Sequence, residues 1–140
     1  MPTFKKHERL THRKVISLTF ESGKVVKKFP FILLYRFDMR RSESPCQVMM
    51  SVGKRNFKKA VDRNRIKRLM KESWRLNKAE LYKTIPSSDQ QLFVILIYTG
   101  KTILTFEETQ QKIKEVSVRL SSTLADQVTI AKANEENQST

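Results

Sequence analysis

A dense run of cationic side chains has the clearest chemistry in this sequence. Between Lys54 and Lys78 the chain carries 11 lysines and arginines but only two acids, Asp62 and Glu72. Such a cluster is the electrostatic footprint of a surface that binds nucleic acid, because each cation can neutralise a phosphate. The segment therefore predicts a contact surface for a polyanion.

Groups that could catalyse a reaction are few and scattered. The two histidines, His7 and His12, both lie near the N-terminus, and the single cysteine, Cys46, follows Pro45 at the expected start of a strand. We interpret Cys46 as a packed thiol rather than a nucleophile. Two-metal hydrolysis needs several converging carboxylates, but the candidate acids are scattered over loops and a helix: Asp38, Glu43, Asp62, Glu72 and Asp89. The sequence thus predicts neither catalytic residues nor a metal site.

The overall composition also favours a protein that binds nucleic acid. The 140 residues fit one domain and carry 28 Lys and Arg against 14 Asp and Glu, a net charge of +14. The excess is local, since residues 1–85 hold 23 of the cations and only 7 of the acids. No apolar run is long enough to span a membrane, and the charged N-terminus does not resemble a secretory signal. We expect a cytoplasmic protein that binds nucleic acid, with a membrane-surface protein as the alternative class.

Hydrophobic periodicity indicates an α+β domain of order αββαβα with one small sheet. Pro30 suggests that the first strand begins there or lies at a sheet edge, and the two early strands suit an antiparallel hairpin with a long connection. Thr11 is the expected cap of the first helix and Gly23 its expected end. The domain covers residues 1–124, and we expect the polar tail, 125–140, to be disordered. The expected elements are helix 11–22, strand 25–37, strand 47–52, helix 57–83, strand 91–98 and helix 106–124.

The long basic helix separates into two faces when each residue is advanced by about 100°. A stripe about 100° wide holds four cations and one amide: Asn64, Lys67, Arg68, Lys71 and Arg75. The opposite side holds the apolar residues Ile66, Leu69, Met70, Trp74 and Leu76. Phe57, Ala60 and Val61 fall on the basic side, which predicts a break near Asp62, with Asp62 as a cap. A solvated face normally mixes charges of both signs, so the stripe favours a phosphate-binding surface. The apolar side could instead face lipid, but the sheet needs it as a cover.

The segment Ser51-Val-Gly-Lys-Arg-Asn-Phe-Lys-Lys-Ala-Val-Asp-Arg-Asn-Arg-Ile-Lys-Arg-Leu-Met-Lys-Glu strongly resembles the signature of the bacterial ribonuclease P protein subunit. Its centre is Arg63-Asn64-Arg65, within Ala60-x-x-Arg-Asn-Arg-Ile-Lys-Arg-x-Met-Lys71. The order of the other elements agrees over about residues 4 to 124, including a Pro-Phe-x-Leu-x-Tyr strand at Pro30. The resemblance implies a left-handed βαβ crossover, as in a domain of some translation proteins. It also implies a protein that assists a catalytic RNA in removing the 5′ leader from precursor tRNA.

The resemblance also assigns residues to partners. It implies a 1:1 complex with the catalytic RNA, whose substrate is precursor tRNA. Neither DNA nor a membrane is an expected partner. Magnesium is expected to be required by the RNA rather than bound by the protein. The leader is expected in a cleft between the first helix and the sheet, at Ile16, Phe20, Phe31 and Tyr35, with Leu34 as the alternative to Tyr35. Many family members have an aromatic residue where this chain has Ile16. The residues expected to contact the catalytic RNA are Lys54, Arg55, Lys58, Lys59, Arg63, Asn64, Arg65, Lys67, Arg68, Lys71 and Arg75.

Two other functions stay open at this point. A ribosome-associated protein could use the same fold to bind structural RNA, but this leaves the Arg-Asn-Arg signature without a reason. A stand-alone ribonuclease could use His7 and His12 or a metal, but the sequence offers no converging set of ligands.

Overall fold

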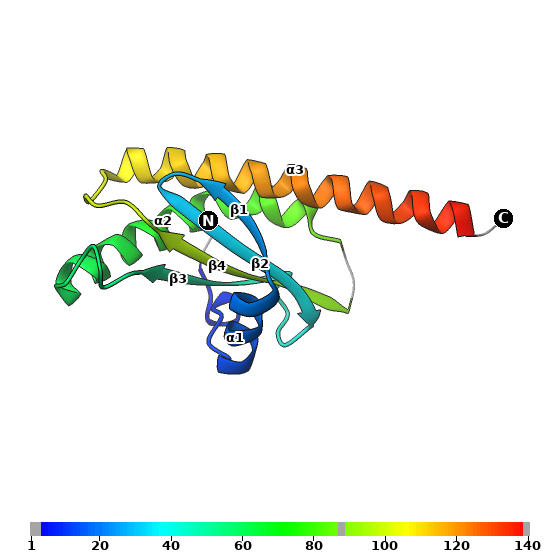
Figure 1. Ribbon diagram of the computed structural model, residues 1–140, viewed down its shortest axis with the longest axis horizontal. Helices are drawn as coiled ribbons and strands as arrows, with labels where there is room; N and C mark the ends of the chain where they lie inside the picture. Colours follow the sequence, from blue (N-terminus) through cyan, green and yellow to red (C-terminus); the bar gives the residue numbers. More distant parts are fainter. Residues whose placement is uncertain (1–3, 87–88, 139–140) are drawn as a thin grey trace.

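The fold is known from a computed structural model that describes residues 4–86 and 89–138. It is a single α+β domain of order αβββαβα, preceded by a short 3-10 turn (Figure 1). The α+β class is therefore confirmed, with one strand more than predicted. The elements are η1 (Lys6–Glu8), α1 (Arg13–Ser22), β1 (Lys24–Lys28), β2 (Phe31–Met39), β3 (Cys46–Val52), α2 (Ala60–Thr84), β4 (Gln90–Tyr98) and α3 (Phe106–Gln138).

The additional strand arises because the segment expected as one strand, 25–37, is two strands joined by a tight turn. β1 and β2 pair antiparallel, with Lys28 opposite Phe31. Phe29 and Pro30 form the turn, and the peptide bond between them is cis. Proline lacks the N–H that a sheet ladder requires, so the ladder is interrupted where Pro30 stands.

β4 is one of the two inner strands of the sheet, whose order is β1-β2-β4-β3. It pairs antiparallel with β2 and parallel with β3. The predicted hairpin between the two early strands is therefore wrong, because β4 separates β2 from β3. The continuous apolar run of β4 fits this place, since a central strand is covered on both faces. The helix between parallel strands, β3–α2–β4, provides the βαβ crossover.

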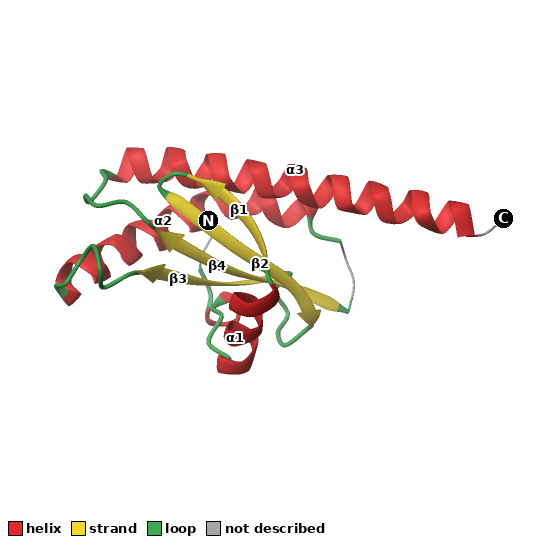
Figure 2. Cartoon of the chain, in the orientation of Figure 1, coloured by secondary structure: helices red, strands yellow, loops and turns green. Residues whose placement is uncertain are grey.

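The sheet lies between two helical layers (Figure 2). α2 and α3 cover one face, while the short α1 crosses the other beside β2 and β4. The main core lies under α2 and α3 and contains Leu33, Trp74, Val94, Ile113 and Leu120. A smaller cluster under α1 contains Leu10, Val15, Phe93 and Ile95. Consecutive residues of β4 thus belong to different clusters, as the alternation of side chains along a strand requires.

Local contacts fix both ends of α1. The imidazole Nδ1 of His12 accepts a hydrogen bond from the backbone N–H of Val15 (3.4 Å), so His12 caps the helix rather than Thr11. Gly23 ends the helix as predicted. A Cβ at Gly23 would lie 2.3 Å from the carbonyl oxygen of Thr19, so a side chain there would force the backbone to shift.

The two long helices differ from the sequence-based bounds. α2 is continuous from Ala60, and Asp62 lies within its first turn. The predicted break near Asp62 is therefore wrong, because Phe57 precedes the helix and Val61 is simply exposed. α3 continues past Leu124 to Gln138. The predicted disorder of the tail stays a prediction, and residues 139–140 lie outside the described part of the chain.

Candidate nucleic-acid interface

The middle of α2 carries a row of cations that point away from the core. Asn64, Arg65, Arg68 and Lys71 are exposed and Lys67 is half-buried. On the opposite side of the helix, the side chains of Ile66, Met70 and Trp74 are buried. The predicted division of the helix into a core face and a cationic face is confirmed for these residues, except that Arg65, which is also exposed, was not part of the predicted stripe. It fails for Leu76, which the angular argument placed in the core but which is exposed.

This row, which we call the α2 stripe (Asn64, Arg65, Lys67, Arg68 and Lys71), carries uncompensated charge on its four cations. Among the residues whose side chains the structure describes, 4–86 and 89–126, no acid forms an ion pair with any of its four cations. Four positive charges on neighbouring helical turns repel one another. A phosphate backbone lying along the helix would relieve that repulsion. If the face only contacted water, the accumulation of like charges would have no explanation.

Two arginines assigned to the same surface have other partners. The Arg63 guanidinium donates to the backbone carbonyls of Phe57 (2.7 Å) and Lys58 (2.8 Å). Arg75 forms an ion pair with Glu72 one turn earlier, and its Nε donates to that carboxylate at 3.2 Å. The hydrogen bond from Arg75 lowers the pKa of Glu72, so the pair stays charged at neutral pH. Arg63 therefore shapes the preceding loop, and the charge of Arg75 is partly balanced.

The loop before α2, residues 53–59, extends the cationic surface. Its four cations are all exposed: Lys54, Arg55, Lys58 and Lys59. Phe57 anchors the loop, because its buried ring packs against Tyr98 with centroids 6.0 Å apart. The Asn56 amide donates to the carbonyls of Thr99 and Gly100, both at 3.4 Å. Sequence reasoning missed these two anchors, since both depend on contacts with residues more than 40 positions away.

Lys78, counted in the basic cluster, does not belong to the surface. It is buried, and its Nζ lies 2.7 Å and 2.8 Å from the two carboxylate oxygens of Glu8. The cationic surface thus ends before Lys78, about two turns from the end of α2.

Of the four residues predicted to bind the leader, only Ile16 and Phe20 lie on the α1 side of the sheet. Phe20 is 51% exposed, and Ile16 packs against the smaller core cluster together with Leu34. Phe31 and Tyr35 are 1% and 3% exposed and belong to the main core on the other face. This corrects the expectation that they share a surface with Phe20. Of the two alternatives for the strand position, Leu34 faces α1 and Tyr35 does not.

Cys46 and His12, two side chains that could in principle take part in catalysis, have structural roles instead. The Cys46 thiol is buried, and burial raises its pKa, so it stays protonated at neutral pH. His12 caps α1. Among the residues that the structure describes, no three His, Cys, Asp or Glu side chains are placed to hold a metal ion together. No helix in the same residues has the length and apolar character needed to span a membrane.

Together the exposed cations of α2, the basic loop and the three-layer fold define a small α+β protein with a surface suited to a polyanion. Residues 4–121 match the family model described as ribonuclease P. The chain is 34% identical to the ribonuclease P protein component of Chlorobium phaeobacteroides, covering 85% of this chain and 90% of that one. It is 29% identical to the component of Porphyromonas gingivalis, covering 86% and 89%.

Solved structures agree with the sequence relatives. The RNase P protein from Thermotoga maritima is similar with a TM-score of 0.63 and 25% identity, covering 80% of this chain and 96% of that one. The Staphylococcus aureus RNase P protein shares the fold, with a TM-score of 0.58 and 20% identity over 78% and 91% of the two chains. The chain therefore belongs to the bacterial ribonuclease P protein family and is a subunit of that tRNA-processing endoribonuclease.

Proposed function

We propose that this protein binds the catalytic RNA of ribonuclease P through the α2 stripe and the loop 53–59. One observation carries the proposal: the four cations of the stripe are accessible and have no acidic partner in the described residues. The ordered loop adds four more exposed cations beside them. Arg63 contributes by holding the carbonyls of Phe57 and Lys58, and Arg75 contributes at the edge of the surface. The complex is 1:1, forms in the cytoplasm, and takes its magnesium through the RNA.

The α1 side of the sheet is the proposed surface for the 5′ leader of precursor tRNA. Phe20 offers an exposed ring on which a base can stack, with Ile16 beneath it in the smaller cluster. Leu34 replaces Tyr35 on this surface, and Phe31 is left out. Ile32 and Ile97 pair directly across β2 and β4 next to Leu34 and are half-buried. An extended single strand can therefore follow this apolar row past α1.

Lys27 extends the same surface with a positive charge. It is exposed and lies opposite Ile32 in the β1–β2 register, so its side chain leaves the sheet on the α1 face. A cation beside an apolar row is the arrangement that single-stranded nucleic acid requires, because bases stack while the phosphates remain charged. Lys27 is thus the proposed phosphate contact for the leader.

The proposal is tested by cleavage of a leader-bearing tRNA precursor at low magnesium, with and without the catalytic RNA. Cleavage that requires both protein and RNA supports the proposal. Cleavage by the protein alone would instead identify a stand-alone ribonuclease. If the protein binds RNA but does not stimulate cleavage by the catalytic RNA, the ribosome-associated alternative is favoured.

A further inference from the structure

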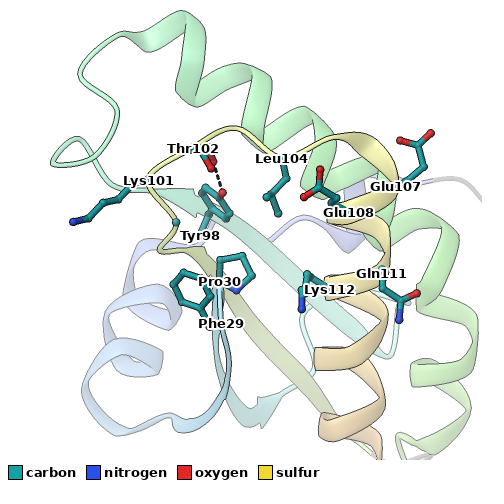
Figure 3. Close-up of a pocket in the computed structure, with 11 residues that line it drawn as sticks. Phe29, Pro30, Tyr98, Lys101, Thr102, Leu104, Glu107, Glu108, Gln111 and Lys112 are labelled. Atoms are coloured by element: carbon teal, nitrogen blue, oxygen red, sulfur yellow. Dashed lines mark hydrogen bonds between the residues drawn. The ribbon is translucent and has the colours of Figure 1, made fainter.

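An apolar pocket lies at the end of the molecule next to the basic loop, and neither proposed RNA surface uses it. It has a volume of about 560 Å³, within the range of ligand-binding pockets. Its walls come from the β1–β2 turn, the connection after β4 and the first turns of α3. Figure 3 shows Phe29, Pro30 and Tyr98 together on one side, with Gln111 and Lys112 on the α3 side.

The exposed aromatic ring of Phe29 is the unusual feature of this pocket. Phe29 is 76% exposed, although it stands in a tight turn where a polar residue would serve. Next to it, Pro30 and Leu104 add apolar surface, and the Tyr98 hydroxyl is occupied by a hydrogen bond to the Thr102 carbonyl. These groups give the pocket an apolar wall on which a planar ring can stack.

Polar groups at the rim match the edge and the backbone of a nucleotide. The carboxylate of Glu108 and the amide of Gln111 line the pocket, and carboxylates and amides are the groups that read the amino edges of bases. Lys101 and Lys112 stand at the two ends of the pocket, where they can meet the flanking phosphates. An uncharged apolar ligand would make no use of these four groups.

The pocket lies directly beside the basic loop. Its loop wall, Gly100 to Thr102, is bonded to the basic loop through the Asn56 amide, which donates to the Gly100 carbonyl. Phe57 of the basic loop packs against Tyr98, a pocket residue. The loop that carries Lys54 to Lys59 is therefore in direct contact with one wall of the pocket.

We propose that the pocket between Phe29 and the start of α3 binds one unpaired, amino-bearing base (adenine, cytosine or guanine) of an RNA strand that the loop 53–59 holds. The base stacks on Phe29, and its amino group donates to the carboxylate of Glu108. Uracil has no such amino group and is disfavoured. This inference rests on the proposed function, because it takes its ligand from an RNA already bound at the loop.

The test compares Phe29→Ala with Phe29→Trp and with Met39→Ala in the assembled holoenzyme. Met39 is a matched control, since it is 78% exposed and lies at the far end of β2. We expect Phe29→Ala to weaken RNA binding about 5- to 150-fold, the range for one lost base stack. Phe29→Trp should keep wild-type affinity because it retains a stacking ring, and Met39→Ala should change nothing.

Chemical probing of base reactivity then locates the nucleotide. One unpaired nucleotide, protected by the wild-type protein, should become reactive with Phe29→Ala and stay protected with the other two variants. Protection in the holoenzyme without substrate assigns the base to the catalytic RNA, and protection that appears only after precursor tRNA is added assigns it to the substrate. Changing that nucleotide to uridine should weaken binding by the wild-type protein but not further weaken binding by Phe29→Ala.

Two results would overturn the inference. The first is wild-type affinity for Phe29→Ala with an unchanged reactivity pattern, and the second is an affinity loss that Phe29→Trp does not restore. Both are distinguishable from failure of the proposed function, because Arg68→Ala/Lys71→Ala reports on the α2 stripe separately. If that double variant also binds RNA normally, the proposed function fails rather than the pocket alone.

Discussion

Glu8 and Lys78 form a buried ion pair that joins the N-terminal segment to the second half of α2. The ammonium lies within hydrogen-bond distance of both carboxylate oxygens, and one of these oxygens also accepts from the backbone N–H of Lys5 (2.8 Å). Lys78 further lies 5.7 Å from the ring centre of Tyr82. The pair thus holds η1 against a helix that is distant in sequence.

Removing one partner of this pair should strongly destabilise the protein. Glu8→Gln leaves the Lys78 ammonium buried without a counter-charge, a change that typically costs about 3–5 kcal/mol. The double variant Glu8→Gln/Lys78→Met removes both charges and should recover part of that loss. Urea unfolding of the single and double variants measures the difference. Equal free energies of unfolding for wild type and Glu8→Gln would show that the pair contributes nothing.

Replacing Arg68 and Lys71 with alanine should weaken binding to the catalytic RNA and flatten its salt dependence. Each lost phosphate contact removes roughly one unit from the slope of log K against log salt concentration. The double variant should stay folded, since both side chains are exposed. A salt titration of binding provides the measurement, with Lys83→Ala as a control for an exposed cation at the other end of α2. An unchanged slope would reject the α2 stripe as a phosphate-binding surface.

Phe20→Ala should lower affinity for tRNA that carries a leader of several nucleotides, and hardly change affinity for mature tRNA. The loss of one stacked base is worth about 1–3 kcal/mol. If Phe20 only anchors α1, both affinities fall together with thermal stability. Binding of both tRNAs to the assembled holoenzyme separates these outcomes, and equal losses for the two would refute Phe20 as a leader contact.

Trp74→Ala should act through stability rather than through RNA contact. The indole is fully buried in the main core, and emptying such a site costs about 3–5 kcal/mol. That is a large share of a total stability of about 5–15 kcal/mol. Thermal unfolding in the absence of RNA tests this expectation. A variant as stable as the wild type would place Trp74 outside the core.

Stability should fall as the pH rises above about 9, and Cys46 should contribute to the slope. Burial raises the pKa of its thiol above the ordinary 9.0, so the unfolded chain releases this proton while the folded chain keeps it. The folded state then binds more protons, and the free energy of unfolding decreases by about 1.4 kcal/mol per pH unit for each such group. Burial raises the pKa of Tyr82 as well, which adds a second contribution of the same sign above about pH 10.

Urea unfolding between pH 7 and pH 11 measures this dependence in wild type, Cys46→Ala and Tyr82→Phe. Both variants should show a shallower decline at high pH, whatever their stability at pH 7. The comparison uses the slope, because Cys46→Ala also changes the packing of the core. If the free energy of unfolding declined with pH as steeply in both variants as in the wild type, Cys46 and Tyr82 would not be the groups responsible.

Much of the candidate RNA surface could be predicted from the sequence because it depends on local geometry. The angular separation of Arg68 and Lys71 from Met70 and Trp74 needs only the helical repeat, and the structure agrees. The burial of β4 likewise agrees with its unbroken apolar run, because a strand covered on both faces needs apolar residues at every position.

The sequence-based predictions are wrong where the position of a residue depends on contacts with residues far away in the chain. Period-two alternation along β2 puts Phe31 and Tyr35 on one face, but this pattern does not say which face α1 covers. Lys78 looked like one more surface cation because its partner, Glu8, lies 70 positions away. Pro30 signalled an interruption, yet whether it opens a strand or turns a hairpin depends on what pairs with the residues before it.

The central position of β4 also determines when the chain can fold during synthesis. β4 lies between β2 and β3 but is made after both, so a nascent chain that stops before Gln90 contains the β1–β2 hairpin and a β3 without its neighbour. A lone hairpin is at best marginally stable in water, and Trp74 then has no sheet to pack against. The ribosome therefore releases the entire basic helix before any stable fold exists to present it, and the domain closes only as the last third of the chain emerges.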